Sequence, residues 1–175
     1  VSTEMASHAF EALHAAGRPL GLKLCGMHTM DSCRIEKAFR HFGHDITSED
    51  NVVDAGLSFA VDLSKPDFIG KSAVAARKES GPKARMVQFL LQDSQPLLYH
   101  NEPILRDGEI VGYLSSGGYG HTLGAAVGLG YVPSEGQSAA EVLASSYEID
   151  VKGTRVKATA SLKPMYDPKS EKVRV

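Results

Sequence analysis

The feature of this sequence that most restricts its fold is a change of pattern near residue 85. Beyond that point, short apolar stretches follow one another and are separated by glycine-containing turns. Such stretches are typical of β-strands, and helical spacing almost disappears. A series of short strands joined by tight turns predicts an antiparallel β-barrel or sandwich. The expected strands are 86–91, 104–106, 109–115, 125–132, 147–151 and 155–162.

Two dipeptides in this region predict tight hairpins. Asp107-Gly108 lies between two expected strands, and Asp-Gly is a strong signal for a two-residue turn, which needs a positive φ at both positions. Lys152-Gly153 is a weaker signal of the same kind between the last two strands. Only residues 138–145 are expected to add a short helix. We therefore expect no helix longer than two turns between residues 100 and 132.

The first part of the chain has helical spacing instead. One of its expected helices carries Ile35, Phe39 and Phe42 on one face and is expected to end at Gly43. The later part of residues 52–61 alternates as a half-buried strand does. The contrast predicts an α+β fold, with an α/β part at residues 1–82 and a β domain at residues 83–175. The expected helices run from Thr3 to Gly17, from Thr29 or Asp31 to Gly43, and from about 69 to 79.

Composition argues against several classes of partner. The 175 residues are 42% hydrophobic, which is enough for a packed core. Their 19 Lys and Arg are spread along the chain and are balanced by 21 Asp and Glu, so we expect neither nucleic acid nor a membrane surface as a partner. No apolar stretch is long enough to span a bilayer. Because the chain begins at Val1 rather than Met, we expect it to be a fragment.

Few residues indicate chemistry by pattern alone. Residues 117–124 are glycine-rich, but a phosphate-binding loop needs a helix after the glycines, and strand-like residues follow here. We therefore expect a barrel connection there. His41 and His44 lack the further paired ligands of a metal site, so we expect no metal. Cys25 and Cys33 are expected to be free, buried thiols in a reducing compartment.

Glu36 allows two interpretations. It lies beside the apolar face of the second expected helix, between the cations Arg34 and Lys37. By position alone it is an ion-pair member on a solvated helix, worth at most about 1 kcal/mol. The alternative is a ligand-binding carboxylate, which the local pattern does not favour.

Four segments of the chain resemble, in the same order, motifs of the glycine-cleavage T-protein (aminomethyltransferase) family. Residues 26–46 resemble its G-x-x-x-x-D-S-x-R-[LI]-E … [YF]-G-x-D-I motif. The variant Arg34-Ile35-Glu36-Lys37 and the ending at residues 163–168 are more similar to the folate domain of sarcosine and dimethylglycine dehydrogenases. The other three segments are residues 67–71 ([DN]-F-I-G-[KR]), residues 112–117 with 122–124 (G-x-[LIV]-T-S-G and [ST]-L-G), and residues 129–132 (L-G-Y-V).

This resemblance implies that the chain is a C-terminal half. It would contain the last part of a ferredoxin-like α/β layer, followed by the C-terminal β-barrel domain of the family. The family's Y-x-G-E-x-G-[YF]-E segment, the aspartate that serves the transfer, and any flavin domain would lie upstream. We therefore expect no catalytic residue in this chain, FAD bound outside it, and no activity in the isolated fragment.

The resemblance also implies a function. The chain would help to pass the one-carbon unit of an oxidised methylamine to tetrahydrofolate. By motif, Glu36 is the carboxylate that accepts the N–H and NH2 groups of the pterin in a bidentate pair. By spacing, Lys65 stands where the family often has arginine, and lysine is a less directional partner. The implied partners are folate, a small methylamine-derived substrate, and the missing N-terminal half or a flavin domain.

Two alternatives stay open at this point. The chain could come from a stand-alone aminomethyltransferase or another folate-dependent demethylase. It could also be a non-catalytic folate-binding relative, although the K-G-C-Y-x-G-Q sequence of that group does not occur in these 175 residues. The implied compartment is the cytoplasm, or the mitochondrial matrix in a eukaryote.

Overall fold

The computed structural model describes residues 1–172 and residue 174, and the chain divides into two compact units, Val1–Met30 and Asp31–Val175. In the first unit, helix α1 (Ala6–Gly17) confirms the first expected helix. Short 3-10 turns precede it at Thr3–Met5 and follow it at Arg18–Leu20. None of these three elements contains a buried residue.

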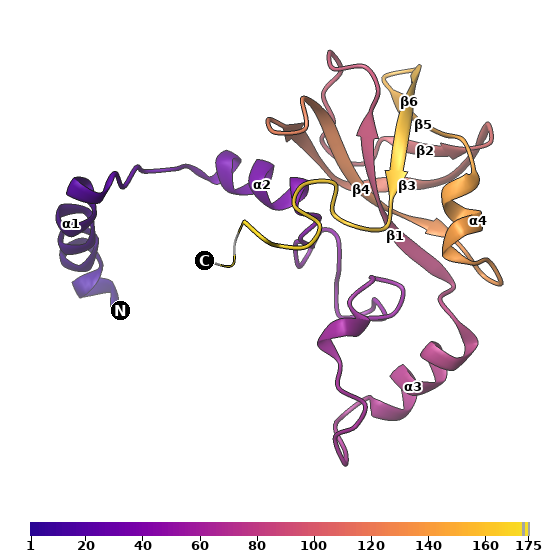
Figure 1. Cartoon of the computed structure of the whole chain (residues 1–175), viewed down its shortest axis with the longest axis horizontal. Helices are drawn as coiled ribbons and strands as arrows, with labels where there is room; N and C mark the ends of the chain where they lie inside the picture. The colour runs from indigo at the N-terminus through magenta and orange to yellow at the C-terminus, as the bar shows by residue number, and fades with distance from the viewer. Residues whose placement is uncertain (173, 175) are drawn as a thin grey trace. The chain divides into compact units, whose positions relative to one another are not determined.

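The second unit is built around a closed antiparallel barrel (Figure 1). The strand order is β1, β4, β3, β2, β5 and β6, and β6 pairs with β1 to close the barrel. The predicted β domain and the α+β fold class are therefore confirmed, and residues 100–132, all of which the structure describes, contain no helix. The strands are β1 (Ala84–Leu91), β2 (Pro103–Arg106), β3 (Glu109–Gly120), β4 (Ala125–Pro133), β5 (Tyr147–Val151) and β6 (Thr154–Ser161).

Both predicted hairpins are present. Strands β2 and β3 meet across Asp107-Gly108, where φ is 54° and 91°. Strands β5 and β6 meet across Lys152-Gly153, where φ is 53° and 84°. A positive φ at both positions is the geometry that a two-residue hairpin prefers. Strand β3 continues to Gly120, so the first half of the glycine-rich stretch belongs to this strand, and only residues 121–124 form the expected connection to β4.

Alternation along the strands gives the sheet two buried faces. Val87 and Phe89 of β1 belong to the main apolar cluster, together with residues of all the other strands. Met86, which precedes Val87 on the strand, joins a second cluster with Leu129 of β4 and with Ile35. Because successive side chains of a strand point to opposite faces, the second cluster lies on the other face of β1 and β4. Helix α2 (Met27–Glu36) contributes Ile35 to this face.

Close packing explains two glycines of β4. A Cβ at Gly128 would lie 2.7 Å from Leu114 Cδ1, and one at Gly130 would lie 2.6 Å from Ile104 Cδ1. Protein interiors are too densely packed to absorb such overlaps without moving the neighbour. Both glycines are therefore needed where β4 faces the apolar side chains of β2 and β3.

Two expectations about the α/β part are wrong. Helix α2 ends at Glu36 instead of Gly43, which leaves Phe39 and Phe42 exposed. Residues 52–61 form turns and a 3-10 helix (Ser58–Ala60) instead of a strand. The remaining two helices are confirmed as α3 (Lys71–Ser80) and α4 (Ala139–Ala144).

Local hydrogen bonds account for the early end of α2. The Phe39 N–H donates to the Arg34 carbonyl and the Ala38 N–H to the Ile35 carbonyl, which is the Schellman arrangement of a helix C-terminus. Ala38 takes the left-handed position with φ of 52°, a place that glycine usually fills. The sequence therefore carried no glycine signal for the end of this helix.

An asparagine turn replaces the expected strand. The Asn51 side chain accepts a hydrogen bond from the Val53 N–H, and the Ala55 N–H donates to the Asn51 carbonyl. Such local side-chain bonds compete with strand pairing.

Among the described residues, no helix is long and apolar enough to cross a membrane.

Candidate functional site

Arg34 of α2 is bonded to a buried carboxylate. Its Nη1 lies 2.7 Å from Asp45 Oδ2 and 3.0 Å from Ser116 Oγ. Asp45 Oδ1 accepts hydrogen bonds from the hydroxyls of Ser115 and Ser116, and Oδ2 accepts one from the His41 N–H. The Asp45 side chain is 0% exposed and uses both oxygens. Arg34 and Asp45 therefore connect the end of α2 and the segment that follows it to the distant strand β3.

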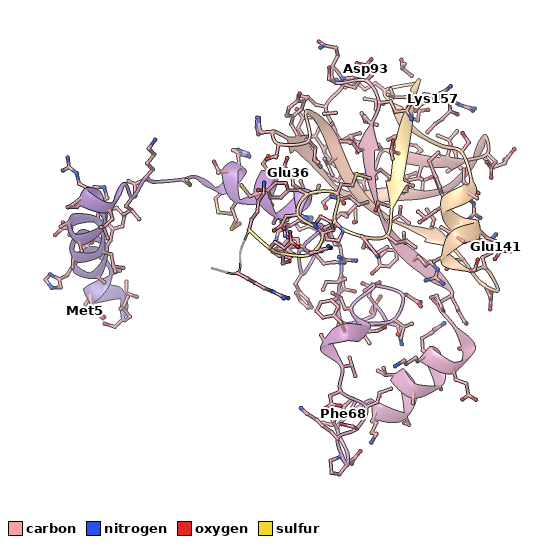
Figure 2. All side chains as sticks on the ribbon, viewed as in Figure 1. Met5, Glu36, Phe68, Asp93, Glu141 and Lys157 are labelled. Carbon is pink, nitrogen blue, oxygen red and sulfur yellow. The ribbon has the colours of Figure 1, made fainter. Side chains whose placement is uncertain are left out.

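Glu36 is held by the turn between β3 and β4. Its Oε1 accepts hydrogen bonds from the Thr122 N–H at 2.6 Å and the Leu123 N–H at 3.0 Å, and the residue is only 4% exposed. Figure 2 shows Glu36 at the end of α2. Neither cation near it in sequence bonds to it, since Arg34 pairs with aspartates and Lys37 pairs with the C-terminal segment. The surface ion pair expected from position alone is therefore wrong.

Gly120 leaves room for this carboxylate. A Cβ at Gly120 would lie 3.2 Å from Glu36 Oε1 and 2.8 Å from Val127 Cγ2. A Cβ at Gly118, on the same strand, would make an ordinary contact of 3.7 Å with Ile35 Cγ2. The sequence showed the glycine-rich stretch, but the amides of Thr122 and Leu123 have no side-chain signature and were missed.

Lys37 ties the C-terminal strap, defined here as residues 163–172, to the end of α2 (Figure 1). Its Nζ donates to the Asp167 carbonyl at 2.6 Å, to Asp167 Oδ2 at 3.2 Å and to Ser170 Oγ at 3.2 Å. The two charged side chains are 7% and 4% exposed. Burial raises the pKa of Asp167, but hydrogen bonds from Lys37 and from two strap N–H groups outweigh this effect, and the pKa is lowered overall.

Gln88 of β1 is hydrogen-bonded to both the strap and the end of α2. Its Nε2 donates to the carbonyls of Ile35 and Glu36 at 2.7 and 3.1 Å, and its Oε1 accepts from the Met165 N–H at 2.8 Å. The Tyr166 N–H also donates to the Glu36 carbonyl, at 3.3 Å. Carbonyls at the end of a helix need such external donors. Nothing in the local sequence marked Gln88 as the residue that supplies them.

Lys65 lies apart from Glu36. It is exposed, and its carbonyl accepts a hydrogen bond from Lys71 Nζ. In Figure 2, the labelled Phe68, three residues further along, is well separated from Glu36. No hydrogen bond or ion pair among the described residues joins Lys65 to Glu36, so the structure does not bring the two predicted site residues together.

The cysteines and histidines show no built site. Cys25 and Cys33 are free, as expected, but both are exposed, so the expectation that they are buried is wrong. The rings of His41 and His44 have centroids 4.6 Å apart. Across the part of the chain that the structure describes, no group of three His, Cys, Asp or Glu side chains is arranged to hold a metal.

Comparison with known proteins identifies the class to which this fold belongs. The family model described as "Glycine cleavage T-protein C-terminal barrel domain" matches residues 85–167, and the family model described as "GCVT N-terminal domain" matches residues 1–65. An aminomethyltransferase T crystal structure from Bartonella henselae superposes with a TM-score of 0.79 and 25% identity, over 94% of this chain and 45% of that one. The chain belongs to the glycine-cleavage T-protein family.

Three relatives contain a part similar to this chain within a longer protein. The 4-methylaminobutanoate oxidase (formaldehyde-forming) of Paenarthrobacter nicotinovorans is 41% identical over 99% of this chain and 20% of its own length. Human mitochondrial sarcosine dehydrogenase is 31% identical over 94% of the chain and 18% of its own length. An aminomethyltransferase of Symbiobacterium thermophilum is 34% identical over 95% of the chain and 43% of its own length. The chain therefore spans less than half of each relative.

Proposed function

We propose that this chain is the C-terminal half of a folate-binding one-carbon-transfer module in a dimethylglycine or sarcosine dehydrogenase-like protein. Its α/β part would comprise residues 1–82, and its barrel domain residues 83–175. Two of the relatives support this placement, since one is named as an oxidase of a methylamino acid and the other as a sarcosine dehydrogenase. The stand-alone aminomethyltransferases of the same family are the alternative parent.

The environment of Glu36 is the observation that carries this proposal. Its carboxylate is buried and fixed by two backbone N–H groups, and it has no cationic partner among the described residues. A reduced pterin presents an N–H and an NH2 side by side, and a carboxylate is a strong acceptor for such donors. Because Oε1 already accepts two hydrogen bonds, we assign the principal contact with the pterin to Oε2. Lys65 would contact the folate from its exposed loop.

The proposed reaction is the transfer of a methylene group from the amine to tetrahydrofolate. In the parent protein, a flavin bound outside this chain would supply the oxidation of the N-methyl group to an iminium and would take up the hydride. One folate nitrogen adds to the CH2 carbon and the second displaces the amine, forming 5,10-methylenetetrahydrofolate. Of the two folate N–H protons, one leaves on the amine and one passes to solvent. The proposed task of this chain is to hold and orient the pterin for the addition.

Exposed apolar side chains support an additional partner for the second unit. Phe42 and Phe59 are among its large exposed hydrophobic residues, and Phe59 is 86% exposed. Large apolar side chains gain free energy when a partner removes them from water. The chain spans 43% of one aminomethyltransferase relative. We propose that the N-terminal half of the module covers these side chains in the full-length protein.

Product analysis of the full-length protein tests the proposed function. Sarcosine, dimethylglycine and 4-methylaminobutanoate are supplied in turn, with and without tetrahydrofolate, and formaldehyde and 5,10-methylenetetrahydrofolate are measured. We expect tetrahydrofolate to replace formaldehyde by the methylene product, and Glu36→Gln to shift the product back to formaldehyde at an unchanged rate of amine oxidation. Equal formaldehyde with and without tetrahydrofolate would contradict the proposal. A full-length protein without bound flavin would favour the aminomethyltransferase alternative.

A further inference from the structure

Lys37 of the buried Lys37–Asp167 pair is the residue next to Glu36, the proposed ligand-binding residue. Lys37 follows Glu36 directly, and its ammonium group is almost fully enclosed by the strap. It is bonded to three oxygens of the strap, so it cannot move without releasing that segment. A lysine with only a surface role would keep its ammonium group in water. The pair therefore fixes the backbone at the position where α2 ends.

The strap also bonds to Glu36 itself through the main chain. The Glu36 carbonyl accepts hydrogen bonds from Gln88 Nε2 and from the Tyr166 N–H. Its side chain accepts hydrogen bonds from the Thr122 and Leu123 N–H groups of the β3–β4 turn. Glu36 is thus held at both its backbone and its carboxylate, although it is the last residue of its helix, where helices otherwise fray.

We propose that Lys37 and Asp167 are positioning residues for Glu36. They do not touch the ligand, but they hold the strap that holds the Glu36 backbone, and so they set where the carboxylate meets the pterin. This inference rests on the proposed function of Glu36. Small misplacements of a binding group are costly, because the geometry of the hydrogen-bonded edge is fixed by the ligand.

Tetrahydrofolate titrations of the full-length protein test this inference. The variants are Lys37→Met, Asp167→Asn and Glu36→Gln, together with each strap variant combined with Glu36→Gln. We expect Lys37→Met and Asp167→Asn each to raise the Kd for tetrahydrofolate about tenfold. In the Glu36→Gln background, the same changes should alter the Kd less than about twofold, because the residue through which they act is already changed. Asp167→Asn keeps the shape of the side chain and serves if Lys37→Met does not fold.

A second ion pair of the same strap supplies the matched control. Lys169 and Glu171 lie 3.9 Å apart with both side chains exposed, so Lys169→Met should leave the Kd unchanged. The inference is overturned if the strap variants lower the melting temperature but keep the wild-type Kd, or if they weaken binding equally in both backgrounds. If Glu36→Gln itself leaves the Kd unchanged, the proposed function fails, and the inference fails with it.

Discussion

The charged residues around the end of α2 divide by what they contact. Arg34 and Asp45 bond to each other and to two serines of β3, and they hold the fold. Glu36 is bonded only to main-chain amides through its carboxylate, so its charge is not neutralised by a cation in the described structure. All three residues belong to one sequence motif, so the motif does not distinguish them. Their hydrogen-bond partners do.

Replacing Asp45 by Ala should lower the free energy of unfolding by roughly 3 kcal/mol, since it leaves Arg34 without its buried partner. Asp31 also pairs with Arg34 but is 44% exposed, so Asp31→Ala should cost at most about 1 kcal/mol. Urea denaturation of both variants measures the difference. Equal losses would show that the buried Arg34–Asp45 pair contributes no more to the free energy of unfolding than the exposed Arg34–Asp31 pair.

The sequence could locate Glu36 only through its motif. Its local pattern favoured a surface ion pair, because Arg34 and Lys37 are its neighbours along the helix. The partners that decide the outcome are two backbone amides more than eighty residues away, and amides carry no residue signature. Gln88 was missed for the same reason, since a single glutamine on a strand does not reveal that it will cap a distant helix.

At the scale of elements, the glycines of β3 differ in what surrounds them. Gly120 is enclosed by Val127 and the Glu36 carboxylate, whereas Gly118 has space for a methyl group. The two positions lie on one strand and two residues apart, so they share face and strand context. Comparing alanine substitutions at the two positions therefore distinguishes the destabilisation caused by crowding from the general effect on stability of replacing a glycine in this sheet.

Gly120→Ala should destabilise the protein by about 1–3 kcal/mol, because the added methyl group overlaps Val127 and presses on Glu36. Gly118→Ala should change the stability by at most about 0.5 kcal/mol. Thermal melts of the two variants give the comparison. A similar melting temperature for both would contradict the packing described for the β3–β4 turn.

Elements with local signals were predictable, and elements that depend on distant partners were not. The barrel strands follow from short apolar stretches separated by turn residues, and the hairpins at Asp107-Gly108 and Lys152-Gly153 follow from the turn chemistry of their own residues. The end of α2 depends on Ala38 in a left-handed conformation and on donors from β1 and the strap. Periodicity carries no information about such partners.

At the scale of the whole molecule, the chain contains a complete barrel but spans less than half of the relatives described above. The barrel has its own apolar core, whereas α1 and α3 contain no buried residue. The motifs carried by this chain were sufficient to predict its family. The division into α/β and β parts at residue 82 stays a prediction.

The isolated chain of residues 1–175 should have no folate-dependent activity. The proposed transfer would need groups that the family resemblance implies lie upstream, and solvent cannot replace prearranged groups around a reacting carbon. The assay compares the purified 175-residue chain with the full-length protein, using formaldehyde, tetrahydrofolate and a methylamine substrate. Turnover by the isolated chain, free of any longer form, would contradict the assignment as a half-module.

The central claim is that Glu36 binds the pterin edge, and the most direct measurement is a tetrahydrofolate titration of full-length wild-type protein and Glu36→Gln. The side-chain carbonyl that Glu36→Gln introduces can still accept from Thr122 and Leu123, so thermal melts should remain similar, while an NH2 group replaces the oxygen assigned to the ligand. Losing a charge-assisted hydrogen bond costs about 1.5–3 kcal/mol, so the Kd should rise by roughly one to two decades. An unchanged Kd in a folded Glu36→Gln protein would contradict the claim. Glu36 would then have only a structural role, connecting α2 to the barrel.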